Sequence, residues 1–208
     1  MKTEILAADH PFALPHAADI LKNGGLVAFP TDTVYGLAAL PFNPEFIERL
    51  YTAKGRNSER AIAILLGNEE QLKQVASEVS ETTHRLTKRF WPGPLTLIVP
   101  KAPSLPKVLS PNPTIGVRIP DHPVARAFLQ LVGPLAVTSA NLSGQGNTRT
   151  AQEVFAQLEG RIDLILDGGQ SPGGVPSTVV DCTSPEPLII REGPVSQKDL
   201  QAAMNEPD

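Results

Sequence analysis

The chain has 208 residues, and its 18 lysines and arginines against 22 aspartates and glutamates give a net charge of −4, which argues against a protein that binds polyanions over its whole surface. Its single cysteine, Cys182, excludes an intrachain disulfide and a thiolate cluster for structural zinc, and the four histidines show no metal-ligand spacing. The apolar runs are too short to cross a bilayer and no signal peptide is evident, so we expect a cytoplasmic protein with no membrane partner.

The first half of the sequence is predicted to alternate helices with short strands. Residues 15–23 should form a helix that Gly24 and Gly25 close, and it leads into a strand over 26–29. Asn43 and Pro44 favour the start of a helix that runs to Lys54. Beyond it we expect a strand over 61–66, helices over 69–76 and 80–90, and a strand over 95–99.

The second half continues the alternation and then becomes rich in strands. Thr150 and Glu153 have the spacing of a capping box at the start of a helix. The other predicted elements are strands over 114–119, 135–138, 164–167, 177–182 and 188–191, a helix over 123–132, and a last helix capped by Ser196. Because several late strands follow one another without a helix between them, the sequence predicts the α/β class with a mixed sheet.

Cationic side chains gather where predicted elements end. Arg118 and Arg191 terminate apolar strands, and Lys54, Arg56 and Arg60 surround one turn. Ligands of α/β proteins collect at strand ends, and the forked guanidinium group matches phosphate and carboxylate geometry. The pattern therefore indicates an anionic ligand of several charges, such as a nucleoside triphosphate.

Spacing alone leaves other interpretations open. A single arginine at a strand end is more often solvated or ion-paired than bound to a ligand, and Ser139 and Asn141 could simply make a polar turn. Residues 144–146, Gly-Gln-Gly, lack the flanking strand and helix of a dinucleotide-binding loop, and there is no Walker A sequence. Cys182, inside an apolar strand, is expected to be a small core residue.

In six segments, the identities of the residues are more informative than their spacing. In chain order they are GGLVAFPTDTVYGLAA (24–39), KGR (54–56), TIGVRIP (114–120), VTSANLSG (137–144), PSTVVD (176–181) and IIREG (189–193). Together they resemble the YrdC-like family of threonylcarbamoyl-AMP synthases, in their single-domain form, over a core of about residues 13–195. The resemblance implies a single α/β domain over residues 1–208, with a large twisted mixed sheet and flanking helices around a positively lined cavity.

The resemblance also implies an activity. Members of this family combine L-threonine, bicarbonate and ATP, with Mg²⁺, to give threonylcarbamoyl-adenylate and pyrophosphate, and the adenylate supplies the modification at adenosine 37 of tRNA. We therefore expect a nucleotidyltransferase that uses these substrates and hands its product to a downstream threonylcarbamoyl transferase. Transfer RNA is the expected final recipient, and direct binding of tRNA is left open.

Site residues follow from matching positions in this resemblance. Lys54 and Arg56 are expected to be catalytic, and Arg118 is expected to pair with the carboxylate of threonine. The implied threonine pocket is made of Thr33, Arg118, Thr138 and Ser177. The implied ATP side is made of Lys54, Arg56, Arg60, Thr114, Ser139, Ala140, Asn141, Thr148 and Arg191. No residue is assigned as a metal ligand, and the 31–35 loop is expected to form one wall of the pocket.

The sequence departs from the family pattern in two places. Arg60-Ala61-Ile62 stands where many members have Lys-Pro-Leu, and Leu65 stands where many place a histidine near the amino-acid substrate. The extra C-terminal domain of longer members is expected to be absent. The glycine-rich run 168–174 is then expected to close the site in its place.

Two rival interpretations belong to other classes. The first is an RNA-binding paralogue of the same fold without synthase activity, against which the acidic charge balance and the 5% aromatic content argue. The second is a paralogue that has lost or changed the synthesis. Lys54, Arg56, Ser139 and Asn141, all present together, count against this second alternative.

Overall fold

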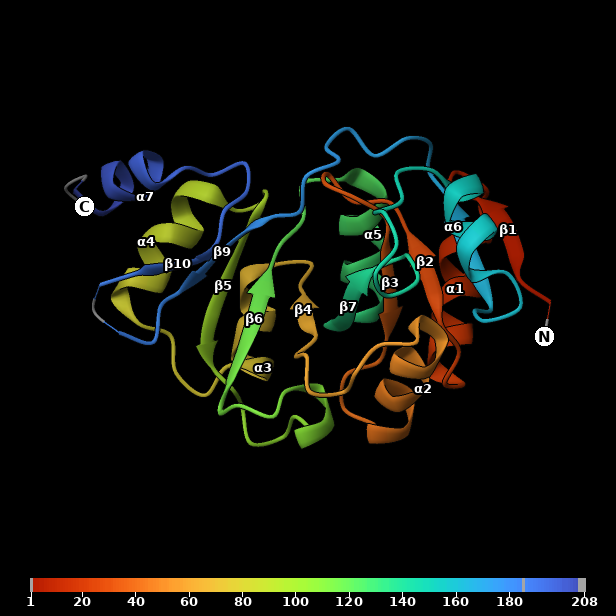
Figure 1. The fold of residues 1–208 in the computed structure, drawn as a ribbon, viewed down its shortest axis with the longest axis horizontal. Helices are drawn as coiled ribbons and strands as arrows, with labels where there is room; N and C mark the ends of the chain where they lie inside the picture. Colours follow the sequence, from red (N-terminus) through yellow and green to blue (C-terminus); the bar gives the residue numbers. More distant parts are fainter. Residues whose placement is uncertain (1, 185, 206–208) are drawn as a thin grey trace.

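One continuous sheet runs along the length of the molecule and positions everything else (Figure 1). The structure is a computed structural model that describes residues 2–184 and 186–205. The sheet has ten strands in the order β1-β8-β2-β3-β7-β4-β6-β5-β9-β10. The strands are β1 (Glu4–Ala7), β2 (Val27–Phe29), β3 (Gly36–Ala39), β4 (Ala63–Leu65), β5 (Leu95–Pro100), β6 (Thr114–Arg118), β7 (Leu135–Ser139), β8 (Leu164–Asp167), β9 (Thr178–Asp181) and β10 (Leu188–Arg191).

The sheet is mixed, as the sequence predicts. The pairs β1–β8, β2–β8, β4–β6 and β5–β9 are parallel, and the remaining neighbours are antiparallel. The helices are α1 (Ala13–Lys22), α2 (Pro44–Lys54), α3 (Leu72–Val75), α4 (Glu81–Phe90), α5 (Pro123–Val132), α6 (Ala151–Leu158) and α7 (Gln197–Asn205), with short 3₁₀ helices at Glu69–Gln71 and Lys107–Leu109. The predicted α/β class with flanking helices is confirmed.

Local sequence signals account for most helix ends. Asn43 Oδ1 accepts a hydrogen bond from the Glu45 amide at 2.9 Å and begins α2, and Thr150 Oγ1 does the same for the Glu153 amide at 3.2 Å at the start of α6. Gly24, with a positive φ of 78°, follows the end of α1. Its amide and that of Gly25 donate to carbonyls of the last helical turns, which confirms the predicted stop.

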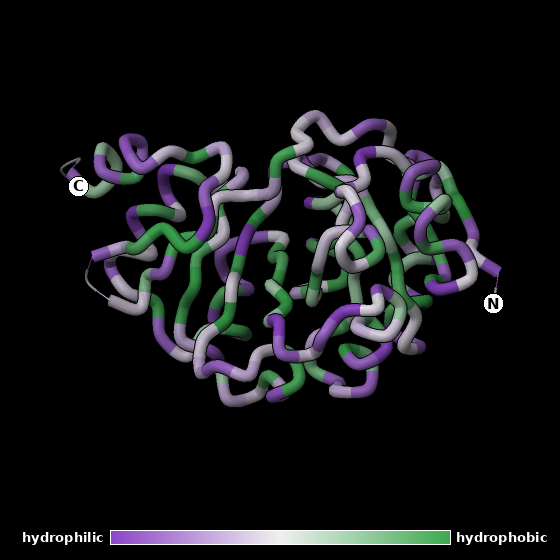
Figure 2. The backbone as a smooth tube through the Cα atoms, in the orientation of Figure 1, coloured by the Kyte–Doolittle hydropathy of each residue, from purple (hydrophilic) through white to green (hydrophobic). Residues whose placement is uncertain are grey.

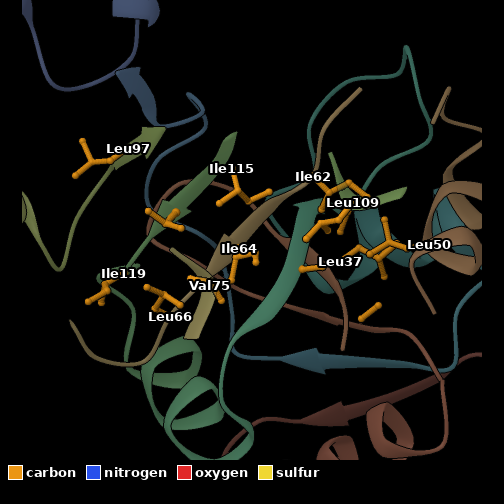
Figure 3. Close-up of a cluster of buried hydrophobic side chains, with 14 of the residues drawn as sticks. Leu37, Leu50, Ile62, Ile64, Leu66, Val75, Leu97, Leu109, Ile115 and Ile119 are labelled. Carbon is orange, nitrogen blue, oxygen red and sulfur yellow. The ribbon is translucent and has the colours of Figure 1, made fainter. Parts of the chain in front are cut away.

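Alternating residues of the central strands divide the core into two clusters, one on each face of the sheet. Ile64 and Ala136 belong to the larger cluster, which α2 also lines, whereas Leu65 and Val137 belong to the smaller cluster under α1 and α5. Figure 3 shows part of the larger cluster, in which side chains from β3, β4, β5 and β6 meet those of α2 and α3. Figure 2 shows the corresponding pattern along the chain, with hydrophobic strands inside and hydrophilic loops and helix faces outside.

The smaller cluster stops before it reaches β6 and β5. On that face, large apolar residues give way to Gly116 and Arg118 of β6 and to Thr96 of β5, because Leu97 and Val117 are paired and point into the larger cluster. Ala63 and Leu65 of β4 lie on the same face. This half of the face therefore mixes the polar residues Arg118 and Thr96 with Gly116, Leu65 and Ile98, and it carries the cavity described below.

Two strands and some boundaries differ from the sequence-based expectation. The strands β1 and β3 were not predicted, because β1 is a largely exposed edge strand and β3, Gly-Leu-Ala-Ala, contains three residues of low β propensity. Pairing with β2 and β7 imposes the extended conformation of β3. The predicted helix over 69–76 is a 3₁₀ turn followed by the single turn α3, and the strand over 61–66 contracts to β4.

Two further expectations can be compared with the fold. Cys182 is buried in the larger cluster, which confirms it as a small core residue. In the described part of the chain, no helix combines the length and the apolar character that crossing a membrane would require.

The central strand provides a matched test of the core. Ile64→Ala should lower the free energy of unfolding by about 2–5 kcal/mol, since Ile64 is fully buried and the substitution leaves a cavity between β7 and β6. Ile190→Ala removes the same atoms from a side chain that is 54% exposed and should cost less than about 0.5 kcal/mol. Urea unfolding of the three proteins measures both values, and equal losses would contradict this assignment of the core.

Candidate functional site

A cavity of about 260 Å³ lies over the half of the sheet that carries Arg118 and Thr96. Segments that are far apart in the sequence line it, including the loop before β3, the residues after α2, the five central strands β3 to β7, the residues just before β9 and the end of β10. The lining residues are Thr31, Thr33, Val34, Tyr35, Gly36, Arg56, Ala61, Ile62, Ala63, Leu65, Thr96, Arg118, Val137, Thr138, Ser139, Asn147, Pro176, Ser177 and Arg191. Three guanidinium groups and several hydroxyls therefore face one small space.

The 31–35 loop forms one wall of this cavity and is held by its own hydrogen bonds. Thr31 Oγ1 donates to the Val34 carbonyl at 2.6 Å and accepts from the Thr33 amide at 3.2 Å, which closes a tight turn. The Tyr35 amide donates to the Thr148 carbonyl, and the Tyr35 carbonyl accepts from the Ala140 amide. The wall is thus fixed by backbone contacts before any ligand arrives.

Arg118 is the most buried of the three arginines that line the cavity, with only 5% of its surface exposed. Its Nε donates to the Gly93 carbonyl at 2.9 Å and its Nη1 to Thr33 Oγ1 at 3.0 Å. Its Nη2 pairs with Asp32 Oδ1 at 2.5 Å. A guanidinium group has five N–H donors, so one on each terminal nitrogen has no protein acceptor in the described part of the chain.

Arg191 approaches the cavity from the opposite side. Its Nη2 donates to the Ser177 carbonyl at 2.7 Å and to Ser177 Oγ at 3.3 Å, and Ser177 Oγ lies 2.8 Å from Thr96 Oγ1. Burial lowers the pKa of Arg191, and the positive charge of Arg118 lowers it further. Both groups remain protonated at neutral pH, so an anion placed between them would relieve their repulsion.

Arg56 extends from the turn that ends α2. Its Nη1 donates to Thr138 Oγ1 at 3.3 Å and its Nη2 to the Ala61 carbonyl at 2.9 Å, while its buried Nε has no partner among the residues that the structure describes. Burial lowers the pKa of Arg56. Three arginines thus line the cavity, and Asp32 pairs with one of them, Arg118. That the cavity as a whole is positively lined stays a prediction.

Lys54 lies behind the cavity wall. It is 2% exposed and is not among the lining residues. Its Nζ donates to the carbonyls of Ser139 and Asn141 at the end of β7. Burial lowers the pKa of Lys54 to about 7, and the nearby charge of Arg56 acts in the same direction.

Several other residues of the expected ATP side also lie outside the lining. Thr148 is fully buried, and its Oγ1 donates to the Ala140 carbonyl at 2.9 Å. Asn141 Nδ2 donates to two carbonyls of the following turn, and the Arg60 side chain is exposed. Thr114 begins β6, at the opposite end of the strand from Arg118. Contact of these residues with a ligand stays a prediction.

The cavity brings together the residues of the expected threonine pocket, Thr33, Arg118, Thr138 and Ser177, and adds some that sequence reasoning missed. Asp32 pairs with Arg118, and Thr96 and Asn147 line the space. The sequence could have indicated Thr96 as a site residue, since it is the one polar residue in the apolar run Leu95–Val99. Nothing in the sequence marks Asn147. Leu65 does face the cavity, as its position relative to the expected amino-acid pocket suggested.

The glycine-rich run 168–174 packs against the 31–35 loop. Tyr35 Oη donates to the Gly169 carbonyl at 2.7 Å, and the Gly174 amide donates to the Thr33 carbonyl at 2.7 Å. A Cβ atom at Gly173 would lie 2.8 Å from Thr33 Cα, so only glycine allows this approach. The segment braces the wall that holds Thr33, and its role in closing the site stays a prediction.

The described residues form no group of three or more histidine, cysteine, aspartate or glutamate side chains that could hold a metal ion.

Fold and site together define an α/β protein whose central sheet carries a cavity lined by three arginines and several hydroxyls. Residues 19–193 match the model of the Sua5_yciO_yrdC family, described as "Telomere recombination". The chain belongs to this family.

Curated relatives carry a common name. The chain is 39% identical over 192 residues to the threonylcarbamoyl-AMP synthase of Pyrococcus abyssi, which covers 91% of the chain and 56% of the relative. It is 38% identical over 205 residues to that of Bacillus subtilis, covering 97% of the chain and 59% of the relative. The chain thus spans little more than half the length of these two relatives. A putative synthase of Mycobacterium tuberculosis (strain H37Rv) is 39% identical over 185 residues, covering 88% of the chain and 85% of the relative.

Solved structures agree with this placement. The structure of P. abyssi Sua5 complexed with L-threonine superposes with a TM-score of 0.91 at 36% identity, covering 99% of this chain and 61% of that chain. Escherichia coli YciO superposes with a TM-score of 0.84 at 29% identity, covering 96% of this chain and 98% of that chain.

The contact between Tyr35 and the glycine-rich run predicts a pH dependence of stability. Burial raises the pKa of Tyr35 from 10.0 to about 12, so the folded state favours the neutral phenol. Its contribution to stability is complete below pH 10 and is lost as the pH rises toward about 12. Tyr35→Phe lacks the group, so the wild type should be more stable by about 0.5–1.5 kcal/mol near neutral pH, with the difference shrinking above pH 10. Urea unfolding of both proteins across this range measures it, and a difference that grows with pH would refute the assignment.

Proposed function

We propose that this protein is a threonylcarbamoyl-AMP synthase, which forms L-threonylcarbamoyladenylate and pyrophosphate from L-threonine, bicarbonate and ATP. The names of its curated relatives support the proposal, as does the solved complex of a 36% identical family member with L-threonine. The observation that carries it is the convergence of Arg56, Arg118 and Arg191 with several hydroxyls in one cavity.

The threonine side of the reaction would use the buried Arg118. Its two remaining N–H groups can donate to a carboxylate, and the ion pair with Asp32 holds the guanidinium in place. Thr33, Thr138 and Ser177 offer hydroxyls to the polar groups of the amino acid. The amine of threonine then attacks the carbon of bicarbonate, a C–N bond forms, hydroxide leaves with a proton as water, and a carbamate results.

The nucleotide side completes the reaction. An oxygen of the carbamate attacks the α-phosphorus of ATP, the bond between the α-phosphorus and the bridging oxygen breaks, and pyrophosphate leaves. Negative charge accumulates on adjacent groups throughout, so catalysis depends mainly on positioning and on fixed positive charge. We propose that Arg56 and Arg191 supply this charge and that Mg²⁺ enters with ATP as part of the substrate. Magnesium ions in such sites take most of their ligands from phosphates and water, which is compatible with described residues that form no group of three or more potential metal-binding side chains.

The size of the cavity indicates how the substrates would be arranged. Sites that enclose a drug-sized ligand measure about 300–1,000 Å³, and this cavity, at about 260 Å³, is smaller. We propose that it encloses threonine and the reacting phosphate, while the nucleoside lies at its mouth. The ATP-side residues outside the lining would then act through the walls or at the mouth.

The product is a mixed anhydride of a carbamate and a phosphate, which is reactive toward amines and water. A downstream transferase must therefore consume it, and we propose that adenosine 37 of tRNA is the final recipient and that the reaction takes place in the cytoplasm. No observation on the surface favours direct binding of tRNA by this chain.

Pyrophosphate release tests the proposal. Release from ATP, Mg²⁺ and bicarbonate should require L-threonine, be weaker with serine, and yield the mass of threonylcarbamoyladenylate. Arg56→Ala should lower kcat/KM by on the order of a hundredfold or more, the loss typical of removing one fixed charge or donor from a transition state. Arg126→Ala removes an exposed arginine of α5 and should leave the rate unchanged.

Two results would overturn the proposal. One is folded protein that releases no pyrophosphate in response to threonine. The other is tRNA binding with steep salt dependence in the absence of turnover, which would favour the RNA-binding paralogue.

A further inference from the structure

Lys54 makes an unusual set of contacts for a lysine beside an anion site. It is the last residue of α2 and is almost completely buried, and its Nζ donates to the backbone carbonyls of Ser139 and Asn141. Its own carbonyl accepts a hydrogen bond from the Ser143 amide at 2.9 Å. Both the side chain and the main chain of Lys54 therefore hold the turn that follows β7.

That turn reaches the cavity through Ser139. Ser139 is a lining residue, whereas Lys54 is not. The turn is also held by the Ala140 amide, which donates to the Tyr35 carbonyl, and by Thr148 Oγ1, which donates to the Ala140 carbonyl at 2.9 Å. Without Lys54, the buried Asn141 carbonyl would lose its donor among the described residues, and the Ser139 carbonyl would keep only the Asn141 amide at 3.0 Å. A buried carbonyl without a donor disfavours the conformation that leaves it unpaired.

The donor count of the amino group points the same way. A charged ammonium group has three N–H donors and a neutral amine has two, and the two carbonyls need only two. The contacts can therefore persist in either protonation state, without a phosphate as a third partner. Arg56, two residues further on, is the charged side chain that faces the cavity from this end of α2.

We propose that Lys54 is a positioning residue, which sets the conformation of the turn over residues 139–143 and so places Ser139 in the cavity, without contacting the triphosphate itself. The inference concerns the same site and rests on the proposed function where it speaks of ATP. The hydrogen bonds by which Lys54 holds the turn, here called the clamp, can be tested without measuring enzymatic activity.

Amide hydrogen exchange tests the clamp directly. In Lys54→Met, which keeps the length and loses the donors, the amides of Ala140, Asn141 and Ser143 should exchange faster by on the order of tenfold or more, while the core strands stay protected. Lys101→Met is the matched control, because Lys101 Nζ also donates to one backbone carbonyl, that of Ser110 at 2.8 Å, and does not line the cavity. It should leave exchange in residues 139–143 unchanged. Unchanged exchange there in Lys54→Met would overturn the proposal.

The pH dependence of turnover separates positioning from contact. The value of kcat/KM for ATP reports the free enzyme, so we compare wild type with Lys54→Met from about pH 6 to about pH 9. Lys54 loses its charge near pH 7. A positioning role predicts a loss in the variant whose size is the same across this range, because the neutral amine still serves both carbonyls. A loss that is present at low pH and disappears as Lys54 deprotonates would show a direct charge contact with ATP and overturn the proposal.

If Lys54→Met does not fold, a measurement on the wild type can still decide whether Lys54 contacts the triphosphate. Nuclear magnetic resonance of the lysine side chains follows the titration of Lys54 with and without ATP and Mg²⁺. Direct contact with the triphosphate would raise the pKa of Lys54 toward its ordinary value on binding, which would overturn the proposal. A pKa that stays near its value in the free protein supports it. Failure of ATP to bind would instead refute the proposed function, while the exchange experiment would still decide the clamp.

Discussion

The buried charge of Arg118 is the constraint on which the rest of the site depends. A guanidinium group at the centre of a sheet costs several kcal/mol in lost hydration unless its donors are satisfied. The protein meets this demand from separate segments, because Gly93, Thr33 and Asp32 each provide an acceptor. The same bonds fix the 31–35 loop over β6, so the feature that makes Arg118 tolerable also builds the cavity wall.

Arg56 and Arg191, the other two arginines of the cavity, are also held by hydrogen bonds from separate segments. Arg191 and Arg56 are satisfied mainly by neutral oxygens of Ser177, Thr138 and Ala61, not by carboxylates. Neutral acceptors hold a guanidinium in position but leave its charge uncompensated. The result is a small, partly desolvated space where positive charge is already oriented, and this is the arrangement that stabilises a transition state with accumulating negative charge.

Sequence reasoning recovered the parts of this arrangement that depend on local chemistry. Asn43 and Thr150 mark helix starts through side-chain caps, and strand periodicity places Arg118 apart from the core residues Ile115 and Val117. It could not recover β3, whose small residues are extended only because β2 and β7 flank them. Nor could it find that Asp32 pairs with Arg118 or that the Lys54 side chain points to the carbonyls of Ser139 and Asn141. These contacts join residues more than 80 positions apart.

Strand register is what converts such distant residues into a single site. Leu65 pairs with Arg118 and Thr96 lies across from the same position, so one face of the central sheet receives all three. A slip of one residue in β6 would turn Arg118 into the larger hydrophobic cluster and expose Val117 to the cavity. Gly36 adds to this constraint, because a Cβ atom there would lie 2.7 Å from Val137 Cγ1, and β3 can approach β7 only without one. The packing of the larger cluster therefore fixes the register of β6, and with it the position of Arg118, whereas Arg56 and Arg191 are placed by the turn after α2 and by the end of the outer strand β10.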